Sequence, residues 1–110
     1  MPRRKSEDID WGLWAQSLKP WMRETLRILA EAEKPLSTVE ILYALADRLE
    51  EEEWRALSEG KTSGYNKLLR FLKRLQAHGI AKRLRIGYYY RYAWRLDDKI
   101  KKSIREALQP

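Results

Sequence analysis

The hydrophobic repeat of this chain changes from a helical period to a strand period at Gly79. Before that glycine lie three leucines, of which the second and third fall within about 40° of the first on a helical wheel. They are Leu68, Leu72 and Leu75. After it, apolar and basic residues alternate over residues 80–86 and again over residues 88–96, on either side of Gly87. The sequence therefore predicts a helix over residues 62–78 and a hairpin over residues 80–96, with the tip near residues 86–88.

Capping residues and apolar stripes predict further helices on both sides of this unit. Asp10 and Asp97 are expected to cap two short terminal helices, and Pro20 suits the first turn of a longer one. Ser37 and Glu40 have the spacing of a capping box. The expected fold is mainly α-helical with one small β-hairpin. It divides into an N-terminal arm and short helix (1–19), a central domain (20–96) and a C-terminal helix (97–110).

The positive charge of the chain is concentrated in one third of its length. The net charge is +7 at pH 7. Residues 61–96 contain 10 Lys or Arg side chains and no Asp or Glu, whereas residues 1–60 contain 9 basic and 13 acidic side chains. Such an asymmetry is typical of proteins that bind a polyanion. The acidic run at residues 50–53 either extends the helix that begins after Ser37 or forms a separate short helix.

The residue types that most catalytic and metal sites require are scarce. The chain has no cysteine, which excludes disulfides, thiolate metal ligands and cysteine nucleophiles. His78 is the only histidine, and its place beside Gly79 suits the negative end of a helix. Four consecutive acids splay around a helix and cannot converge on one ion. Without a glycine-rich phosphate loop as well, we expect no enzyme activity, no metal and no cofactor.

Sequence features also indicate where such a chain would work. No apolar run approaches the ~20 residues that span a bilayer, so no membrane association is expected. The basic residues 3–5 are followed by polar residues rather than an apolar stretch, unlike a secretory signal. We therefore expect a cytoplasmic protein. Asn66 is the only asparagine in a chain rich in Glu, Lys and Arg, which favours a thermophilic source.

Three segments of the chain resemble the winged helix-turn-helix family. Residues 68–80, LLRFLKRLQAHGI, look like the end of the recognition helix in small prokaryotic transcription regulators. Residues 34–37 look like the turn between the first two helices, and residues 92–96 look like the returning strand of the wing. The resemblance covers residues 20–96, with the acidic stretch 50–59 as an addition to the compact form. It implies a winged-helix domain, with extra terminal helices, that binds double-stranded DNA as a transcriptional regulator.

In such a domain one helix enters the major groove, so the resemblance assigns DNA contacts to the exposed face of the helix over residues 62–78. Arg70 is expected to donate to guanine, and Asn66 to pair with adenine. The other expected contacts on this helix are Ser63, Lys67, Lys73 and Arg74, of which the last three would bind phosphates. The hairpin is expected to present one outward face to the DNA backbone or minor groove. That face would consist of Arg83, Arg85, Tyr89, Arg91 and Arg95.

Other partners stay open at this point. A protein-interaction winged helix in a larger assembly would use exposed tryptophans as anchors. RNA or single-strand binding would use the tyrosines of residues 88–90 for stacking, although Tyr90 is expected in the core. A homodimer is also expected, because both terminal helices carry apolar stripes that could pack within one chain or between two. The stripes are Trp11, Trp14 and Leu18, and Ile100, Ile104 and Leu108.

Overall fold

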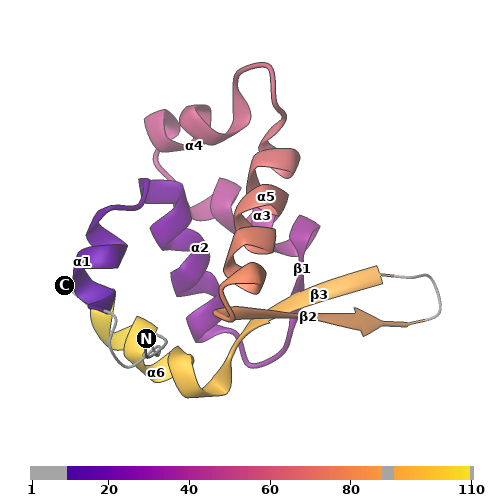
Figure 1. Cartoon of the computed structure of the whole chain (residues 1–110). Helices are drawn as coiled ribbons and strands as arrows, with labels where there is room; N and C mark the ends of the chain where they lie inside the picture. Colours follow the sequence, from indigo (N-terminus) through magenta and orange to yellow (C-terminus); the bar gives the residue numbers. More distant parts are fainter. Residues whose placement is uncertain (1–9, 88–90, 110) are drawn as a thin grey trace.

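The computed structural model describes residues 10–87 and 91–109. These residues form six α-helices and a three-stranded antiparallel sheet with the strand order β1-β3-β2. The elements are α1 (Trp11–Gln16), α2 (Pro20–Glu31), β1 (Leu36–Ser37), α3 (Thr38–Arg48), α4 (Glu51–Ser58), α5 (Gly64–Ala77), β2 (Ala81–Ile86), β3 (Arg91–Leu96) and α6 (Asp98–Ala107). Figure 1 shows the helices gathered into one body, from which the β2–β3 hairpin stands out. Within the described residues, no helix is long and apolar enough to cross a membrane.

The predicted helix starts are confirmed by their capping hydrogen bonds. Asp10 accepts a hydrogen bond from the backbone N–H of Leu13 at 3.1 Å. Ser37 and Glu40 form the complete capping box, each side chain accepting from the other's backbone N–H. The acidic run forms the separate helix α4 rather than an extension of α3. Gly60 follows that helix with φ +113°, a backbone conformation that side chains disfavour.

Stability is expected to fall in acid because two capping carboxylates titrate below their ordinary range. The backbone N–H of Ser37 lowers the pKa of Glu40 from its ordinary 4.5, and the backbone N–H of Lys99 lowers the pKa of Asp97 from 3.8. A depressed native pKa stabilises the fold above the ordinary pKa, and this contribution is lost as the pH falls through the native one. Thermal unfolding from about pH 5 down to about pH 2 should therefore show a falling midpoint. Glu40→Gln and Asp97→Asn should flatten that fall, and unchanged profiles would contradict the assignment.

The apolar face of α5 lies at the centre of the core. Leu68, Leu72 and Leu75 are at most 1% exposed, as the helical wheel predicted, and Phe71 is buried beside them. Phe71 meets Trp21 of α2 edge to face, with the ring centroids 5.6 Å apart. α5 contacts α2, α3, α4 and β2, and residues on the side opposite the leucines, among them Arg70 and Arg74, are exposed to solvent.

Trp94 packs the base of the hairpin against the helical body. It lies in the central strand β3, opposite Leu36 of β1 and Arg83 of β2. Its side chain is buried, and the indole N–H donates to the hydroxyl of Thr38 at the start of α3, at 2.9 Å. The buried hydrogen bond and the β1 pairing together fix where the hairpin stands relative to α3.

The expectation that the hairpin carries its arginines on one face is wrong. Opposite residues of an antiparallel pair share a face, and Arg83 pairs with Trp94 whereas Lys82 pairs with Arg95. Arg83 and Arg85 therefore lie on one face, and Arg95 and the backbone position of Arg91 belong to the other. A turn centred on Gly87 would pair residue 86 with residue 88, but residue 86 pairs with residue 91. The observed pairing thus differs from the expected one by an odd number of residues. Such a shift moves every side chain of one strand to the other face of the sheet.

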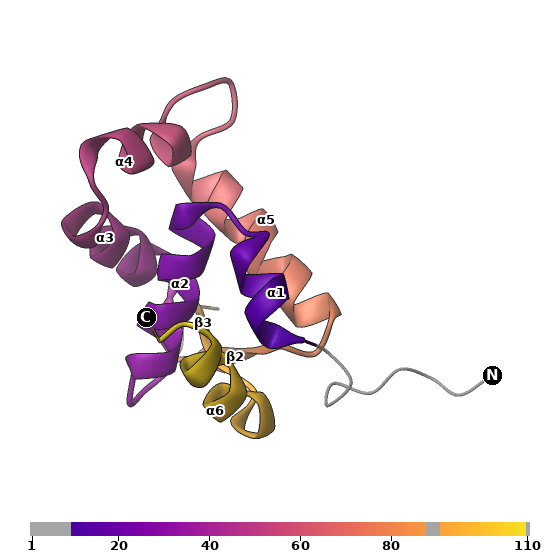
Figure 2. The same cartoon turned by 90° about the vertical axis from the view of Figure 1, so that its left-hand side faces the viewer.

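The two terminal helices contact each other within the chain, as Figure 2 shows. Ile100, Ile104 and Leu108 are buried, while Trp11 and Trp14 are half-buried and meet edge to face with ring centroids 5.5 Å apart. The apolar stripes thus pack within one chain, which is one of the two expected arrangements. The homodimer stays a prediction. Most of the apolar side chains of these stripes pack inside the protomer.

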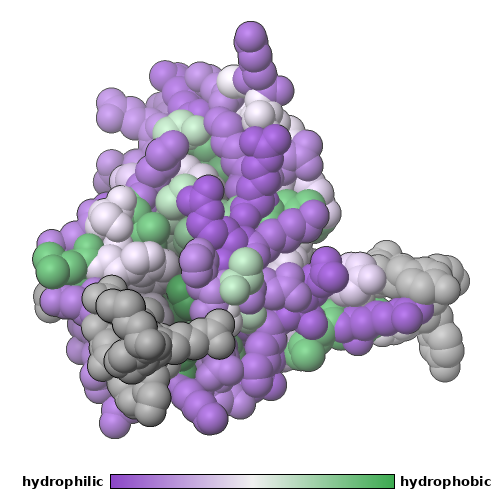
Figure 3. All heavy atoms as spheres, viewed as in Figure 1, coloured by the Kyte–Doolittle hydropathy of each residue, from purple (hydrophilic) through white to green (hydrophobic). Residues whose placement is uncertain are grey.

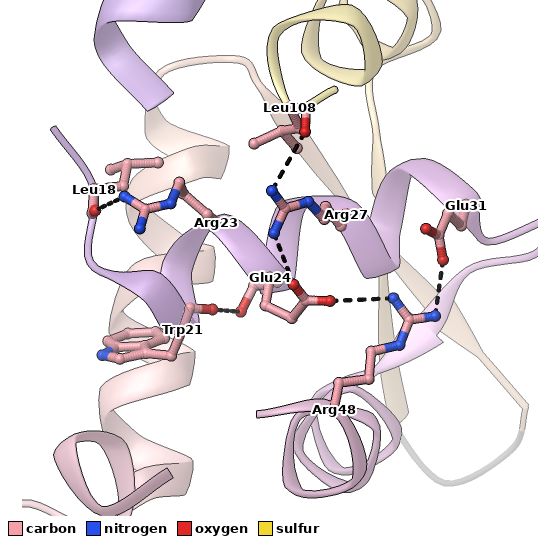
Figure 4. Close-up of polar contacts among 9 residues, drawn as sticks. Leu18, Trp21, Arg23, Glu24, Arg27, Glu31, Arg48 and Leu108 are labelled. Atoms are coloured by element: carbon pink, nitrogen blue, oxygen red, sulfur yellow. Dashed lines mark hydrogen bonds and ion pairs between the residues drawn. The ribbon is translucent and has the colours of Figure 1, made fainter. Parts of the chain in front are cut away.

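Polar contacts along α2 connect it to its neighbours (Figure 4). Arg48 of α3 pairs with Glu24 at 3.4 Å and with Glu31 at 2.8 Å. Arg27 donates to Glu24 at 2.9 Å and to the carbonyl of Leu108, beyond α6, at 3.3 Å. The acidic side chains of α2 are therefore engaged with arginines of the helical body, and not with the basic residues of α5 or the hairpin.

Candidate nucleic-acid interface

The solvent face of α5 carries the basic side chains that were expected on the exposed face of this helix. Asn66, Arg70, Lys73 and Arg74 are exposed. In the space-filling view the surface over α5 is mainly hydrophilic (Figure 3). The helix begins at the cap Ser63, whose hydroxyl accepts from the backbone N–H of Asn66 at 3.2 Å. The positive end of the helix dipole therefore adds to the side-chain charge at this end.

Four of the predicted contact residues meet in one shallow hollow of about 450 Å³ at the start of α5. Lys61 joins them from the loop before the helix. We call this set the α5 surface: Lys61, Ser63, Asn66, Arg70 and Lys73. Arg74 lies at the edge of the same helix face and does not line the hollow. Sequence reasoning missed Lys61 because it precedes the helix, although it belongs to the same acid-free stretch.

The cations of the α5 surface form no ion pairs with acids among the described residues. Over residues 10–87 and 91–109, no ion pair joins an acid to Lys61, Arg70 or Lys73. The glutamates of α4 do not reach them, and the one that forms an ion pair, Glu51, binds Arg55 at 2.6 Å within its own helix. The positive charge of the α5 surface is therefore uncompensated within the described part of the chain.

Lys67 binds backbone carbonyls of the protein itself, contrary to its predicted role as a phosphate contact. Its ammonium donates to the carbonyls of Ala56 at 3.1 Å and Glu59 at 2.6 Å, at the end of α4. These carbonyls lie at the negative end of that helix, where a cation is favoured. On the wheel of its own helix Lys67 lies at the edge of the basic face. That position does not indicate that α4 ends beside it.

Replacing Lys67 should therefore affect folding more than binding. Lys67→Ala is expected to lower the free energy of unfolding by about 1 kcal/mol, because two carbonyls at the end of α4 lose their donor. Urea denaturation measures this. The matched variant Lys73→Ala, on the opposite edge of the same face, should leave stability unchanged. A Lys67→Ala protein with full stability would show that the capping contacts contribute nothing.

One face of the hairpin continues the α5 surface. Arg83 lines a groove between the hairpin, α5 and the start of α3, and Lys73 lines the same groove from α5. The guanidinium of Arg83 lies over the ring of Tyr92, with its carbon 4.4 Å from the centroid. Arg85 is exposed on this same face. Lys73 therefore belongs both to the hollow on α5 and to the groove beside the hairpin.

The other face of the hairpin is partly neutralised. Lys82 pairs with Asp97 at 3.4 Å, and Arg95 forms an ion pair with Asp98. Tyr89 lies outside the described residues, with Tyr88 and Tyr90, and the side chain of Arg91 is not described either. Of the predicted hairpin contacts, the structure therefore brings Arg83 and Arg85 to the side of α5 and separates Arg95 from them.

All five tryptophans pack in or against the core. Trp21 and Trp94 are buried, and Trp11, Trp14 and Trp54 are half-buried against the core. None of the five is a freely exposed anchor of the kind that the protein-interaction alternative requires.

Among the described residues, no group of three or more His, Asp or Glu side chains is placed to hold a metal ion.

Comparisons with protein-family models, with curated proteins and with solved structures found no match to this chain.

Proposed function

We propose that this chain is a winged-helix protein that binds double-stranded DNA through α5 and acts as a transcriptional regulator. The order α2, α3, α5, β2, β3 corresponds to the three helices and hairpin that the family resemblance implies, with α4 as the acidic addition. The observation that carries the proposal is the uncompensated charge of the α5 surface, continued by Arg83 through Lys73. A duplex is a polyanion that such a surface would attract.

Within this proposal the residues of α5 take different tasks. Asn66 and Arg70 are about one helical turn apart and both exposed, so they would face neighbouring bases in the major groove. Arg70 lies near the centre of the α5 surface. Its planar guanidinium can donate two hydrogen bonds, to O6 and N7 of guanine. Lys61 and Lys73 lie at its borders, where phosphates would pass. Arg83 would approach the backbone from the hairpin.

Arg70→Ala should weaken binding to a preferred duplex by about 1–3 kcal/mol and relax base preference at one position. Selection from a random duplex pool identifies the preferred sequence, and fluorescence anisotropy then measures the affinity. Lys73→Ala should instead weaken all duplexes alike, because a phosphate contact reads no sequence. If Arg70→Ala left the selected sequence unchanged, Arg70 would not be a base-reading residue.

The class of partner is tested by competition among a duplex, the same DNA as a single strand and a structured RNA at low salt. The proposal expects the duplex to bind most tightly. Tighter binding of RNA would favour the RNA alternative. Failure of all three to bind would overturn the proposal and favour a protein partner.

A further inference from the structure

The groove beside the hairpin is unusually rich in exposed aromatic and aliphatic side chains. Tyr65 of α5, Val39 of α3, and Ile86 and Tyr92 of the hairpin line it, and each is 40–46% exposed. They are four of the six large hydrophobic residues that are exposed in the described part of the chain. The groove has a volume of about 810 Å³, within the range of about 300–1,000 Å³ typical of small-molecule sites. We call it the tyrosine groove.

The charges around the tyrosine groove favour an anionic occupant. Lys73 and Arg83 line it, and no ion pair joins either of them to an acid in residues 10–87 and 91–109. Glu40 is the one acid on its lining, and its carboxylate is turned to the backbone N–H of Ser37 at 3.0 Å, in the capping box. Its negative charge is therefore partly offset by the start of α3.

The planar groups of the groove favour a nucleobase over a phosphate alone. Arg83 and Tyr92 form a stacked pair on the hairpin side, and Tyr65 stands on the α5 side. Unpaired bases stack on tyrosine rings and on arginine guanidinium planes. A base-paired duplex presents sugars and phosphates at its edge and keeps its bases stacked inside, so it would offer these side chains no base to stack on.

We infer that the tyrosine groove holds an unpaired nucleotide of a DNA strand whose paired part lies on the α5 surface. The inference rests on the proposed duplex binding and names its preferred form, a duplex with a single-stranded extension. Continuity supports it: Lys73 and Leu69 line both the hollow on α5 and the tyrosine groove, so a strand leaving the duplex passes directly from one to the other. The side chains that line the groove come from β1, α3, α5 and the β2–β3 hairpin.

The test compares three DNAs by fluorescence anisotropy. They are a blunt duplex, the same duplex with a short single-stranded extension at either strand end, and the same extension built from abasic nucleotides. The abasic form carries the same phosphates without bases, so it controls for added charge. The extension with bases, at one of the two strand ends, should bind about fivefold to about a hundredfold more tightly than its abasic form, as stacking of one base implies.

Variants locate the effect. Tyr65→Ala should abolish the difference between the two extensions and leave blunt-duplex affinity unchanged, whereas Tyr65→Phe should preserve it. Tyr43→Ala removes a more exposed tyrosine, 72% exposed on α3 and outside the groove, and should change nothing. A 2-aminopurine at the first unpaired position should lose fluorescence on binding to the wild-type protein and not to Tyr65→Ala.

The outcomes separate this inference from the proposed function. Equal binding of blunt, extended and abasic duplexes, unaffected by Tyr65→Ala, would overturn the inference and leave duplex binding standing. Equal binding of the single strand alone and the extended duplex would also overturn it, because the paired part would then contribute nothing. If no form of DNA binds, the proposed function itself fails.

Discussion

Raising the salt concentration from about 50 to about 200 mM is expected to weaken duplex binding about 500-fold. The estimate takes about five phosphate contacts per chain, which release condensed counterions with a slope of log K against log salt of about −4.5. Such contacts are expected because no acid within the described residues forms an ion pair with the cations of the α5 surface. Anisotropy titrations at a series of salt concentrations measure the slope. A slope near zero would mean that binding does not depend on phosphates.

A pair of lysine variants checks where those phosphates are bound. Lys73→Ala should reduce the slope by about one, since it removes one phosphate contact. Lys102→Ala is the matched control, because Lys102 is equally an exposed helix lysine but belongs to α6. It should leave the slope unchanged. The reverse pattern would place the duplex on the terminal helices.

Trp94→Ala is expected to destabilise the protein by about 3–5 kcal/mol, a large share of the about 5–15 kcal/mol that domains of this size have. The side chain is 1% exposed, so its removal leaves a cavity between the sheet and α3 and deprives the buried Thr38 hydroxyl of its donor. Urea denaturation gives the change in free energy. Tyr43→Ala, at an exposed position, should change it by less than about 0.5 kcal/mol.

The milder variant Trp94→Phe connects this packing to binding. It keeps most of the buried area but removes the hydrogen bond to Thr38, at a cost of about 1–3 kcal/mol. Where the protein is still folded, the hairpin should be held less firmly beside α3, and the contribution of Arg83 to duplex affinity should fall. A Trp94→Phe protein with wild-type stability would show that the buried hydrogen bond is dispensable.

Features set by neighbouring residues could be predicted from the sequence. The caps at Asp10, Ser37 and Asp97 depend on side chains two or three residues from the groups they bind. The burial of Leu68 and Leu72 and the exposure of Arg70 follow from the period of a single helix. Both kinds of feature are local, which is why patterns along the chain predict them.

Features that depend on contacts between elements could not be predicted in this way. The face of Arg83 depends on the hairpin register, and the pairing of β2 with β3 differs from the expected one by an odd number of residues, which reversed the expectation. The role of Lys67 depends on where α4 ends. Tyr65 falls near the leucine side of the wheel, yet it is 41% exposed and lines the groove from the first turn of α5.

The most direct test of duplex binding by the α5 surface is a map of backbone amide chemical shifts as isotope-labelled protein is titrated with duplex DNA. We predict that the largest changes occur at Asn66, Arg70 and Lys73 on α5 and extend to Arg83 on the hairpin, while α4 and α6 change little. Changes confined to α1 and α6, with α5 unaffected, would contradict the account.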